Sequence, residues 1–234
     1  ADTEGRTWPL DELRGEPVVL ITGSATCPAT HGSVPALKKV HTEFGDQSRW
    51  FYLYVREAHP GEKLPAHGTY VQKRAQAEFF RQMDHIPWPV LVDELDGTVA
   101  RQYTQLPNAV FVIDADGTVV FRGTVAHGPT LRRALHHLLH HGGRGRIEDD
   151  SDRMPHMLGA TAFGWEAIER GGRMAVHDMW KGAPPLAANL WLGNRMKPLI
   201  GPFARRDRKI PAAVKVAAAV AAAALIIRRR RARE

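Results

Sequence analysis

Short apolar runs rich in β-branched and aromatic residues alternate with segments of helical periodicity over the first 141 residues. The runs that predict buried strands are 17–22, 50–55, 89–93, 109–114 and 118–123. The segments that predict helices are 28–44, 70–83, 94–104 and 129–141. In the second of these helices, Val71, Ala75, Phe79 and Met83 stand at intervals of four, which predicts an amphipathic helix. This order of elements predicts an α/β sandwich around a mixed sheet.

The same order, βαβαβαββα with a thiol just after an early strand, is typical of the thioredoxin-like fold. We therefore predict a thioredoxin-like three-layer α/β sandwich over residues 1–141. A charged linker, 142–158, and a basic, mostly helical C-terminal tail, 159–234, follow it. The charge divides accordingly: residues 1–150 hold 16 Lys and Arg against 19 Asp and Glu (net −3), and residues 151–234 hold 16 against 6 (net +10).

Cys27 is the only cysteine, and it stands between the first predicted strand and the helix that starts at Pro28. At the start of a helix, backbone N–H groups and the helix dipole favour a thiolate. Pro35 interrupts the same helix, as a proline does in thioredoxins, and Pro107 precedes a strand where that fold places a cis-proline beside the nucleophile. These features favour a reactive Cys27 over an inert buried one.

The Cys-x-x-Cys motif of thioredoxins is incomplete, because Thr30 stands where the second cysteine would be. An oxidised Cys27 therefore has no internal partner and must be regenerated by an external thiol or a thioredoxin-type reductant. With one cysteine no internal disulfide can form, so nothing in the composition argues for an oxidising compartment. The polar N-terminus does not have the pattern of a signal peptide. We expect a cytoplasmic protein.

Glu57 and His59 lie two residues apart where the second predicted strand ends, so their side chains share one side. A carboxylate beside an imidazole fixes the tautomer and stabilises the imidazolium, which predicts an acid/base pair. In this fold the end of that strand lies alongside the cysteine loop. The alternative is a solvated loop with two ordinary polar residues.

Three short motifs resemble the iodothyronine deiodinases: 23-GSATCP-28, 54-YVREAHP-60 and 64-LPAH-67. In that family the first motif carries selenocysteine where this chain has Cys27. The resemblance spans about residues 15–140. It implies reductive removal of iodine from an aromatic ring, with a thiol cosubstrate that resets the enzyme and no bound cofactor.

The resemblance also implies residue roles. Cys27 would be the nucleophile, and Ser24 and Thr26 its hydroxyl neighbours. Side chains that would line the pocket and relay protons are Tyr54, Glu57, His59 and His67. His127 stands in 123-GTVAHGP-129, where the vertebrate enzymes have an arginine that helps to hold the hormone. Sulfur in place of selenium predicts slower deiodination.

Two other functions remain open at this point. Ser24-x-x-Cys27 resembles the Thr-x-x-Cys of peroxiredoxins, which suggests a peroxidase or a redox sensor, although no arginine is evident beside the thiol. From another class, the body could be a non-catalytic adaptor of redox fold whose tail does the binding. The histidines of 136-HHLLHH-141 stand at i, i+4, but we expect them to favour the helix dipole without binding a metal.

The tail ends in an alanine-rich run, 211–227, followed by an arginine cluster, 228–234. This run is too short and too rich in alanine for a good transmembrane span. Binding to an anionic membrane surface, with Trp180, Leu190 and Trp191 at the interface, competes with a solvated basic helix. Nucleic-acid binding lacks a supporting motif. A small-molecule substrate is expected, and homodimerisation stays open.

Overall fold

The computed structural model describes residues 1–104, 106–145, 147 and 158–207. The strands are β1 (Val18–Gly23), β2 (Arg49–Tyr54), β3 (Val90–Val92), β4 (Val110–Ile113) and β5 (Val119–Gly123). The helices up to residue 141 are η1 (Leu10–Leu13), α1 (Pro28–Phe44), η2 (Gly45–Gln47), α2 (Tyr70–Met83), α3 (Thr98–Tyr103) and α4 (Gly128–His140). Every strand and helix predicted for this part is present, with ends shifted by a few residues at most.

The strands form one mixed sheet in the order β3-β2-β1-β4-β5. β1 runs parallel to β2, and β2 parallel to β3, whereas β4 lies antiparallel to both β1 and β5. The α/β sandwich with a mixed sheet is thus confirmed. Because β1 and β2 are parallel neighbours, the loops that follow them, with Cys27 and Glu57, leave the same edge of the sheet.

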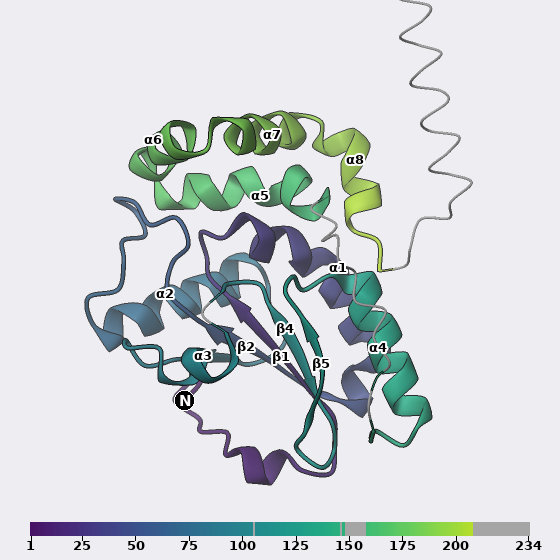
Figure 1. The fold of residues 1–234 in the computed structure, drawn as a ribbon. Coiled ribbons are helices and arrows are strands. Elements are labelled where there is room, and N and C mark those ends of the chain that lie inside the picture. The colour runs from purple at the N-terminus through teal and green to yellow at the C-terminus, as the bar shows by residue number, and fades with distance from the viewer. Residues whose placement is uncertain (105, 146, 148–157, 208–234) are drawn as a thin grey trace, which may run out of the picture.

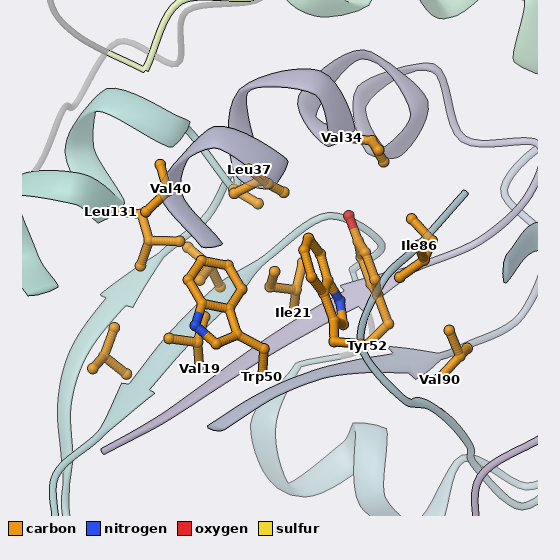
Figure 2. Close-up of a cluster of buried hydrophobic side chains, with 14 of the residues drawn as sticks. Val19, Ile21, Val34, Leu37, Val40, Trp50, Tyr52, Ile86, Val90 and Leu131 are labelled. Atoms are coloured by element: carbon orange, nitrogen blue, oxygen red, sulfur yellow. The ribbon is translucent and has the colours of Figure 1, made fainter. Parts of the chain in front are cut away.

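Alternate residues of the central strands bury on opposite faces of the sheet. One face carries Val19, Ile21, Trp50 and Tyr52 and packs against α1, α2 and α4 (Figure 2). The other face carries Val18, Leu20, Phe51 and Leu53 and packs against α3 and the N-terminal segment around Trp8. The sheet is therefore buried on both sides, which explains why its strands read as continuous apolar runs.

The amphipathic helix α2 is present, but the apolar residues at intervals of four do not form its buried face. Val71 is 72% exposed and Met83 is 51% exposed, whereas Lys73, Ala77 and Phe80 are buried. The buried residues Lys73, Gln76, Ala77 and Phe80 follow the i, i+3, i+4, i+7 spacing of a helix of 3.6 residues per turn, which a strict spacing of four does not. Phe80 packs against the rings of Tyr52 and Tyr54, and this contact sets the orientation of α2.

Four further helices form a layer on top of α1, called here the C-terminal layer: α5 (Leu158–Gly171), α6 (Arg173–Gly182), α7 (Pro184–Arg195) and α8 (Lys197–Ala204). α5 lies directly over α1, and α6 and α7 lie on the far side of α5 (Figure 1). The layer has its own apolar cluster, which includes Trp165, Ile168, Met179 and Leu190.

Glycines allow α5 to approach α1 at backbone distance. A Cβ on Gly32 would lie 2.3 Å from the carbonyl carbon of Gly159, and a Cβ on Gly164 would lie 2.6 Å from Cβ of Pro28. Neither glycine could carry a larger side chain without separating the helices. The first turn of α1, which follows Cys27, is consequently covered by α5.

Two sequence-based expectations for the C-terminal region concern the membrane. Leu190 was expected at an interface, but it is buried in the C-terminal layer at 1% exposure, so that assignment is wrong. None of the helices in the described ranges is both long enough and apolar enough to cross a bilayer. The predictions for 211–227 and 228–234 lie outside the described residues, as does most of the predicted linker 142–158.

Candidate functional site

Cys27 is the residue that caps the N-terminus of α1, with an extended backbone (φ −86°, ψ 117°) and Pro28 in the first helical position. Proline fits there because its missing N–H would have no helical partner anyway. The cysteine is a free thiol and only 6% exposed. α5 crosses over the next residue in the chain, with Gly164 against Pro28.

The expected stabilisation of a Cys27 thiolate is not realised in this closed arrangement. Burial raises the pKa of the thiol, and hydrogen bonds with the Thr30 side chain and with the backbone of Thr30 and Ala29 offset it only in part. The negative charge of Glu57 raises the pKa further. At neutral pH the resting form of Cys27 is therefore the protonated thiol, because desolvation outweighs the helix N-terminus.

Glu57 is the centre of a buried polar cluster, called here the Glu57 cluster (Thr26, Tyr54, Glu57 and His67). One carboxylate oxygen, Oε2, accepts hydrogen bonds from the Thr26 backbone N–H (2.9 Å) and hydroxyl (2.5 Å). The other, Oε1, accepts from the Tyr54 hydroxyl and lies 3.7 Å from His67 Nε2. The Glu57 side chain is fully buried, so these partners replace water completely.

In this cluster the pKa of Glu57 is lowered and the pKa of Tyr54 is raised. Burial opposes ionisation of Glu57, but the nearby His67 ring and the hydrogen bonds from Thr26 and Tyr54 outweigh it and lower the pKa of the carboxyl. Burial, together with the adjacent Glu57 charge, raises the pKa of Tyr54 well above its usual value. A carboxylate and a neutral phenol therefore face each other, an arrangement that can hold and pass a proton.

The predicted pairing of Glu57 with His59 is replaced by a pairing of Glu57 with His67. His59 joins the site through its backbone N–H, which donates to Thr26 Oγ1 at 3.0 Å. Its half-buried ring has a pKa lowered by burial, against the opposing effect of Glu57, and is neutral at pH 7. The loop after β2 turns the Glu57 side chain into the interior and leaves the His59 side chain only half-buried.

Thr26 and Ser24 connect the cysteine loop to the loop after β2. Thr26 donates twice to Glu57 and accepts from His59, and Ser24 Oγ accepts from the Ala58 N–H at 3.3 Å. The structure therefore brings together the two segments that the sequence singled out, through the residue directly before Cys27.

The structure places Pro107 and His127 as follows. Among the described residues no peptide bond is cis, so the prediction of a cis-proline at 107 is wrong. The unusual backbone lies one residue later, at Asn108, whose φ is +72° and whose Oδ1 accepts from Ser33 of α1 at 3.0 Å. His127 caps α4 and is hydrogen-bonded to Thr130, 2.9 Å away.

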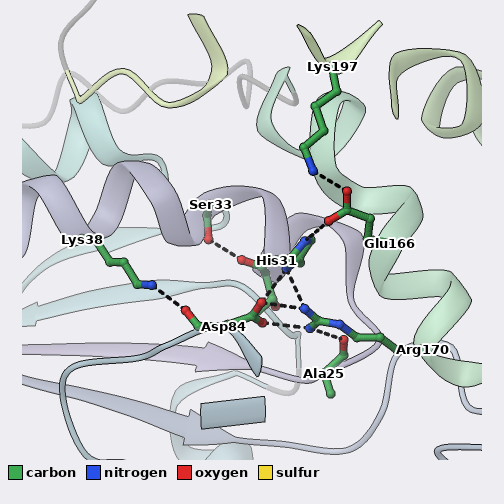
Figure 3. A network of polar contacts seen from close by, with 9 residues as sticks. Ala25, His31, Ser33, Lys38, Asp84, Glu166, Arg170 and Lys197 are labelled. Atoms are coloured by element: carbon green, nitrogen blue, oxygen red, sulfur yellow. Dashed lines mark hydrogen bonds and ion pairs between the residues drawn. The ribbon is translucent and has the colours of Figure 1, made fainter. Parts of the chain in front are cut away.

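A buried polar network that the sequence analysis missed joins α5 to the rest of the chain (Figure 3). Arg170 of α5 holds Asp84, at the end of α2, with two hydrogen bonds of 2.7 and 2.9 Å. His31 of α1 lies 2.7 Å from the same carboxylate and 3.2 Å from Glu166 of α5. Lys197 of α8 pairs with Glu166. We call this set the Arg170 network.

The Arg170 network also reaches the cysteine loop, since Arg170 donates to the carbonyl of Ala25 at 3.3 Å. Burial raises the pKa of Asp84, but Arg170 and His31 outweigh it and bring it to about 2. Burial likewise opposes protonation of His31, but Asp84 and Glu166 outweigh it and raise its pKa. One sequence signal could have indicated that α5 packs closely on another helix: the small residues of 159–164, Gly159, Ala160, Ala162 and Gly164.

A second attachment of the C-terminal layer lies on the loop after β2. The backbone N–H groups of Arg173 and Met174 donate to the Glu62 carboxylate at 2.5 and 2.9 Å, which caps α6. Lys63 N–H donates to the carbonyl of Gly171 at 3.1 Å. Both loops that carry the candidate site are therefore held by the C-terminal layer.

A known protein family matches the part of the chain that carries this site. The sequence profile described as iodothyronine deiodinase matches residues 9–135. The chain belongs to the iodothyronine deiodinase family. The match covers Cys27 and the whole Glu57 cluster but ends before α5, so Glu166 and Arg170 lie beyond it.

A curated relative is the type I iodothyronine deiodinase of Xenopus laevis, which is 25% identical over 123 residues. These residues are 48% of this chain and 48% of that protein, so the chain spans about half the length of the curated relative it matches. The family's signature places selenocysteine at the position of Cys27, and this chain supplies sulfur there.

Two solved structures resemble the fold. An uncharacterised conserved protein of Geobacillus kaustophilus shares 18% identity at a TM-score of 0.52, over 64% of this chain and 82% of that one. A hypothetical protein of Sinorhizobium meliloti shares 17% identity at a TM-score of 0.51, over 64% and 83%. The strand order and the position of Cys27 at the start of α1 are those of a thioredoxin-like fold.

No cluster of three or more metal-ligating side chains occurs within the described ranges. His136 and His140 lie with their Nε2 atoms 3.2 Å apart on the exposed side of α4, near its end. The chemistry that the candidate site offers is therefore that of one thiol, one buried carboxylate, a phenol and two imidazoles.

Proposed function

We propose that this protein is a thiol-dependent oxidoreductase of deiodinase type, in which Cys27 attacks an iodinated aromatic compound or a related electrophile. The observation that carries the proposal is the position of Thr26, which joins the cysteine loop to Glu57 by two hydrogen bonds and to His59 by a third. The nucleophile is thereby fixed against a proton-relay cluster. Membership of the deiodinase family supports the same reaction class.

The proposed reaction runs in three steps. The sulfur of Cys27 takes the iodine as the carbon–iodine bond breaks, the ring carbon takes a proton, and a sulfenyl iodide forms on Cys27. An external thiol then displaces iodide and forms a mixed disulfide with Cys27. A second external thiol releases Cys27 and leaves as a disulfide. Two thiols are oxidised for each aryl iodide reduced.

The protons move through side chains of the site. Because the resting thiol is protonated, a base must take its proton, and the neutral ring of His59 is suited to this role. Tyr54, with its proton held against Glu57, and His67 form the relay toward the ring carbon. Substrate must also displace part of the cover over Cys27, which is 6% exposed.

The test compares wild type with Cys27→Ser in the presence of dithiothreitol and an iodinated phenol, and separately with peroxide. Iodide release by the wild type that the variant lacks supports the proposal. Peroxide consumption without iodide release would replace it with a peroxidase or redox sensor that uses the same thiol. If neither reaction depends on Cys27, the adaptor function takes its place.

A further inference from the structure

The outer helices of the C-terminal layer expose more apolar surface than the rest of the molecule. Eight of the fourteen exposed large apolar side chains in the described part of the chain lie in or between α6, α7 and α8, a small fraction of its length. They are Met174, Trp180, Leu186, Trp191, Leu192, Met196, Leu199 and Phe203. A concentration of this kind on helices that face away from the core indicates a surface that contacts something apolar (Figure 1).

The charges among these side chains are almost all positive. Residues 173–206 hold six Lys and Arg and a single acid, Asp178. The guanidinium of Arg195 lies 4.1 Å from the ring centre of Trp191, so a tryptophan at the surface is paired with a cation. Apolar side chains with tryptophan, interleaved with cations, are the composition that binds anionic interfaces.

A pocket lies where α7 and α8 meet α5. It has a volume of about 530 Å³, and its charged lining consists of three cations, Arg195, Lys197 and Arg205, and one carboxylate, Glu166. Lys197 is paired with Glu166, but neither arginine forms an ion pair with a described residue. Leu192, Met196 and Leu199 lie within three residues of Arg195 or Lys197 in sequence and are exposed. The pocket can therefore receive an anionic group while the apolar side chains enter a non-polar phase.

We propose that the outer face of α6, α7 and α8 docks on an anionic phospholipid bilayer, with headgroup phosphates at Arg195 and Arg205. Charge complementarity selects this occupant over a second copy of the chain, because two like-charged faces would repel each other. Trp191, Leu199 and Phe203 enter the interfacial region, and the candidate site on the opposite side of α5 stays in water. Residues 208–234 add eight Lys and Arg against one acid, which strengthens the attraction without defining the face.

The test is flotation of the full chain with phosphatidylcholine vesicles, with and without phosphatidylserine, at two salt concentrations. We expect binding only to the vesicles that contain phosphatidylserine and less of it at high salt. The double variant Arg195→Gln, Arg205→Gln should partition about 25-fold more weakly, since each basic residue at an anionic surface contributes about a factor of five. The control double variant Lys63→Gln, Arg74→Gln removes the same charge from other exposed positions and should bind like wild type.

A second variant and its control replace apolar side chains and change the net charge by the same amount, so that a difference between them does not come from net charge. Leu199→Asp and Val71→Asp introduce the same acid at side chains that are 70% and 72% exposed, on α8 and α2. Only Leu199→Asp should lose most of the binding. The proposal would be overturned if Leu199→Asp bound as well as Val71→Asp, or if the two double variants bound equally. The attraction would then be assigned to residues 208–234. No binding of the wild type would overturn it too, as would a dimer, seen by light scattering, that Leu199→Asp dissociates.

Discussion

Arg170 of α5 donates two hydrogen bonds, of 2.7 and 2.9 Å, to the carboxylate of Asp84 at the end of α2. The two side chains are only 11% and 2% exposed. The pair ties α5 to the end of α2, and through Ala25 it touches the loop that carries Cys27. Nothing in the sequence spacing connects residues 84 and 170, so this contact is a product of the tertiary fold alone.

The first prediction concerns this pair. Arg170→Gln leaves Asp84 buried without its main cation, so we expect the free energy of unfolding to fall by about 3 kcal/mol. The matched control is Arg101→Gln, which breaks an ion pair of the same length, 2.7 Å, whose side chains are 47% and 60% exposed. Exposed pairs contribute at most ~1 kcal/mol. Urea denaturation measures both, and equal losses would contradict the role assigned to Arg170.

The second prediction concerns the Thr26 hydroxyl. Thr26→Val keeps the shape of the side chain but removes one donor to Glu57 and the acceptor of the His59 N–H. We expect a loss of about 2 kcal/mol in stability, because two buried partners lose a hydrogen bond. Iodide release should fall at least tenfold, whereas Thr26→Ser should retain most of it.

A matched control for Thr26 is Thr42→Val, since the exposed Thr42 hydroxyl bonds only to a carbonyl of its own helix. Its stability and activity should stay close to those of wild type. If Thr26→Val keeps full activity, the link between the cysteine loop and Glu57 is structural and the proposed mechanism must be revised.

The third prediction concerns the charge of Glu57, which raises the pKa of Cys27. Glu57→Gln removes that charge, so the pKa of the thiol should fall and the thiolate should appear at lower pH. The rate of alkylation by iodoacetamide, followed against pH, should shift its midpoint downward. Asp116→Asn, a change of the same charge at an exposed turn, should leave the midpoint in place; a midpoint that rises in Glu57→Gln would contradict the assignment.

The fourth prediction concerns pH and His31. Asp84 and Glu166 raise the pKa of His31 above its ordinary value of 6.5, against the opposing effect of burial. The protonated ring therefore stabilises the fold fully below pH 6.5, and this contribution is lost as the pH rises through the folded-state pKa. The melting temperature should fall on the alkaline side of 6.5, and His31→Gln should flatten this decline. An unchanged decline would assign it to other groups.

The fifth prediction concerns the glycines between α1 and α5. Alanine in place of a helical glycine normally stabilises by up to ~1 kcal/mol. Gly32→Ala should instead destabilise by about 1–3 kcal/mol, since its Cβ would collide with the backbone of α5. Cys27 should become about tenfold faster to alkylate as α5 separates. Gly182→Ala, where nothing lies within 4 Å of the new Cβ, serves as the control and should be neutral or stabilising.

Local signals in the sequence predicted the strands and helices of the first 141 residues because each one forms from residues close in the chain. The β1 run, bounded by glycines, and the helix from Pro28 are examples. The side chains around Glu57 were also identified, but not their pairing. Whether His59 or His67 faces the carboxylate depends on how the loop after β2 turns, and no periodicity encodes that turn.

What the sequence could not reveal is contact between distant segments. The basic composition after residue 150 predicted a tail, yet Gly159, Gly164 and Arg170 belong to a helix packed on α1. Net charge reflects the side chains that such helices expose to solvent and does not predict which side chains they bury. The protonated state of Cys27 was missed for the same reason, because its cover comes from α5.

The close crossing of α5 over α1 has a consequence for the order in which the chain is synthesised. Cys27 leaves the ribosome well before Gly164 and Arg170, and translation of the intervening residues takes on the order of ten seconds. During that interval the β1–α1 unit can form and His31 is already available to Asp84, but the contacts that come from Gly164 and Arg170 are still absent. The cysteine loop therefore gains its contact with Arg170, and Pro28 its contact with Gly164, only after α5 has been made.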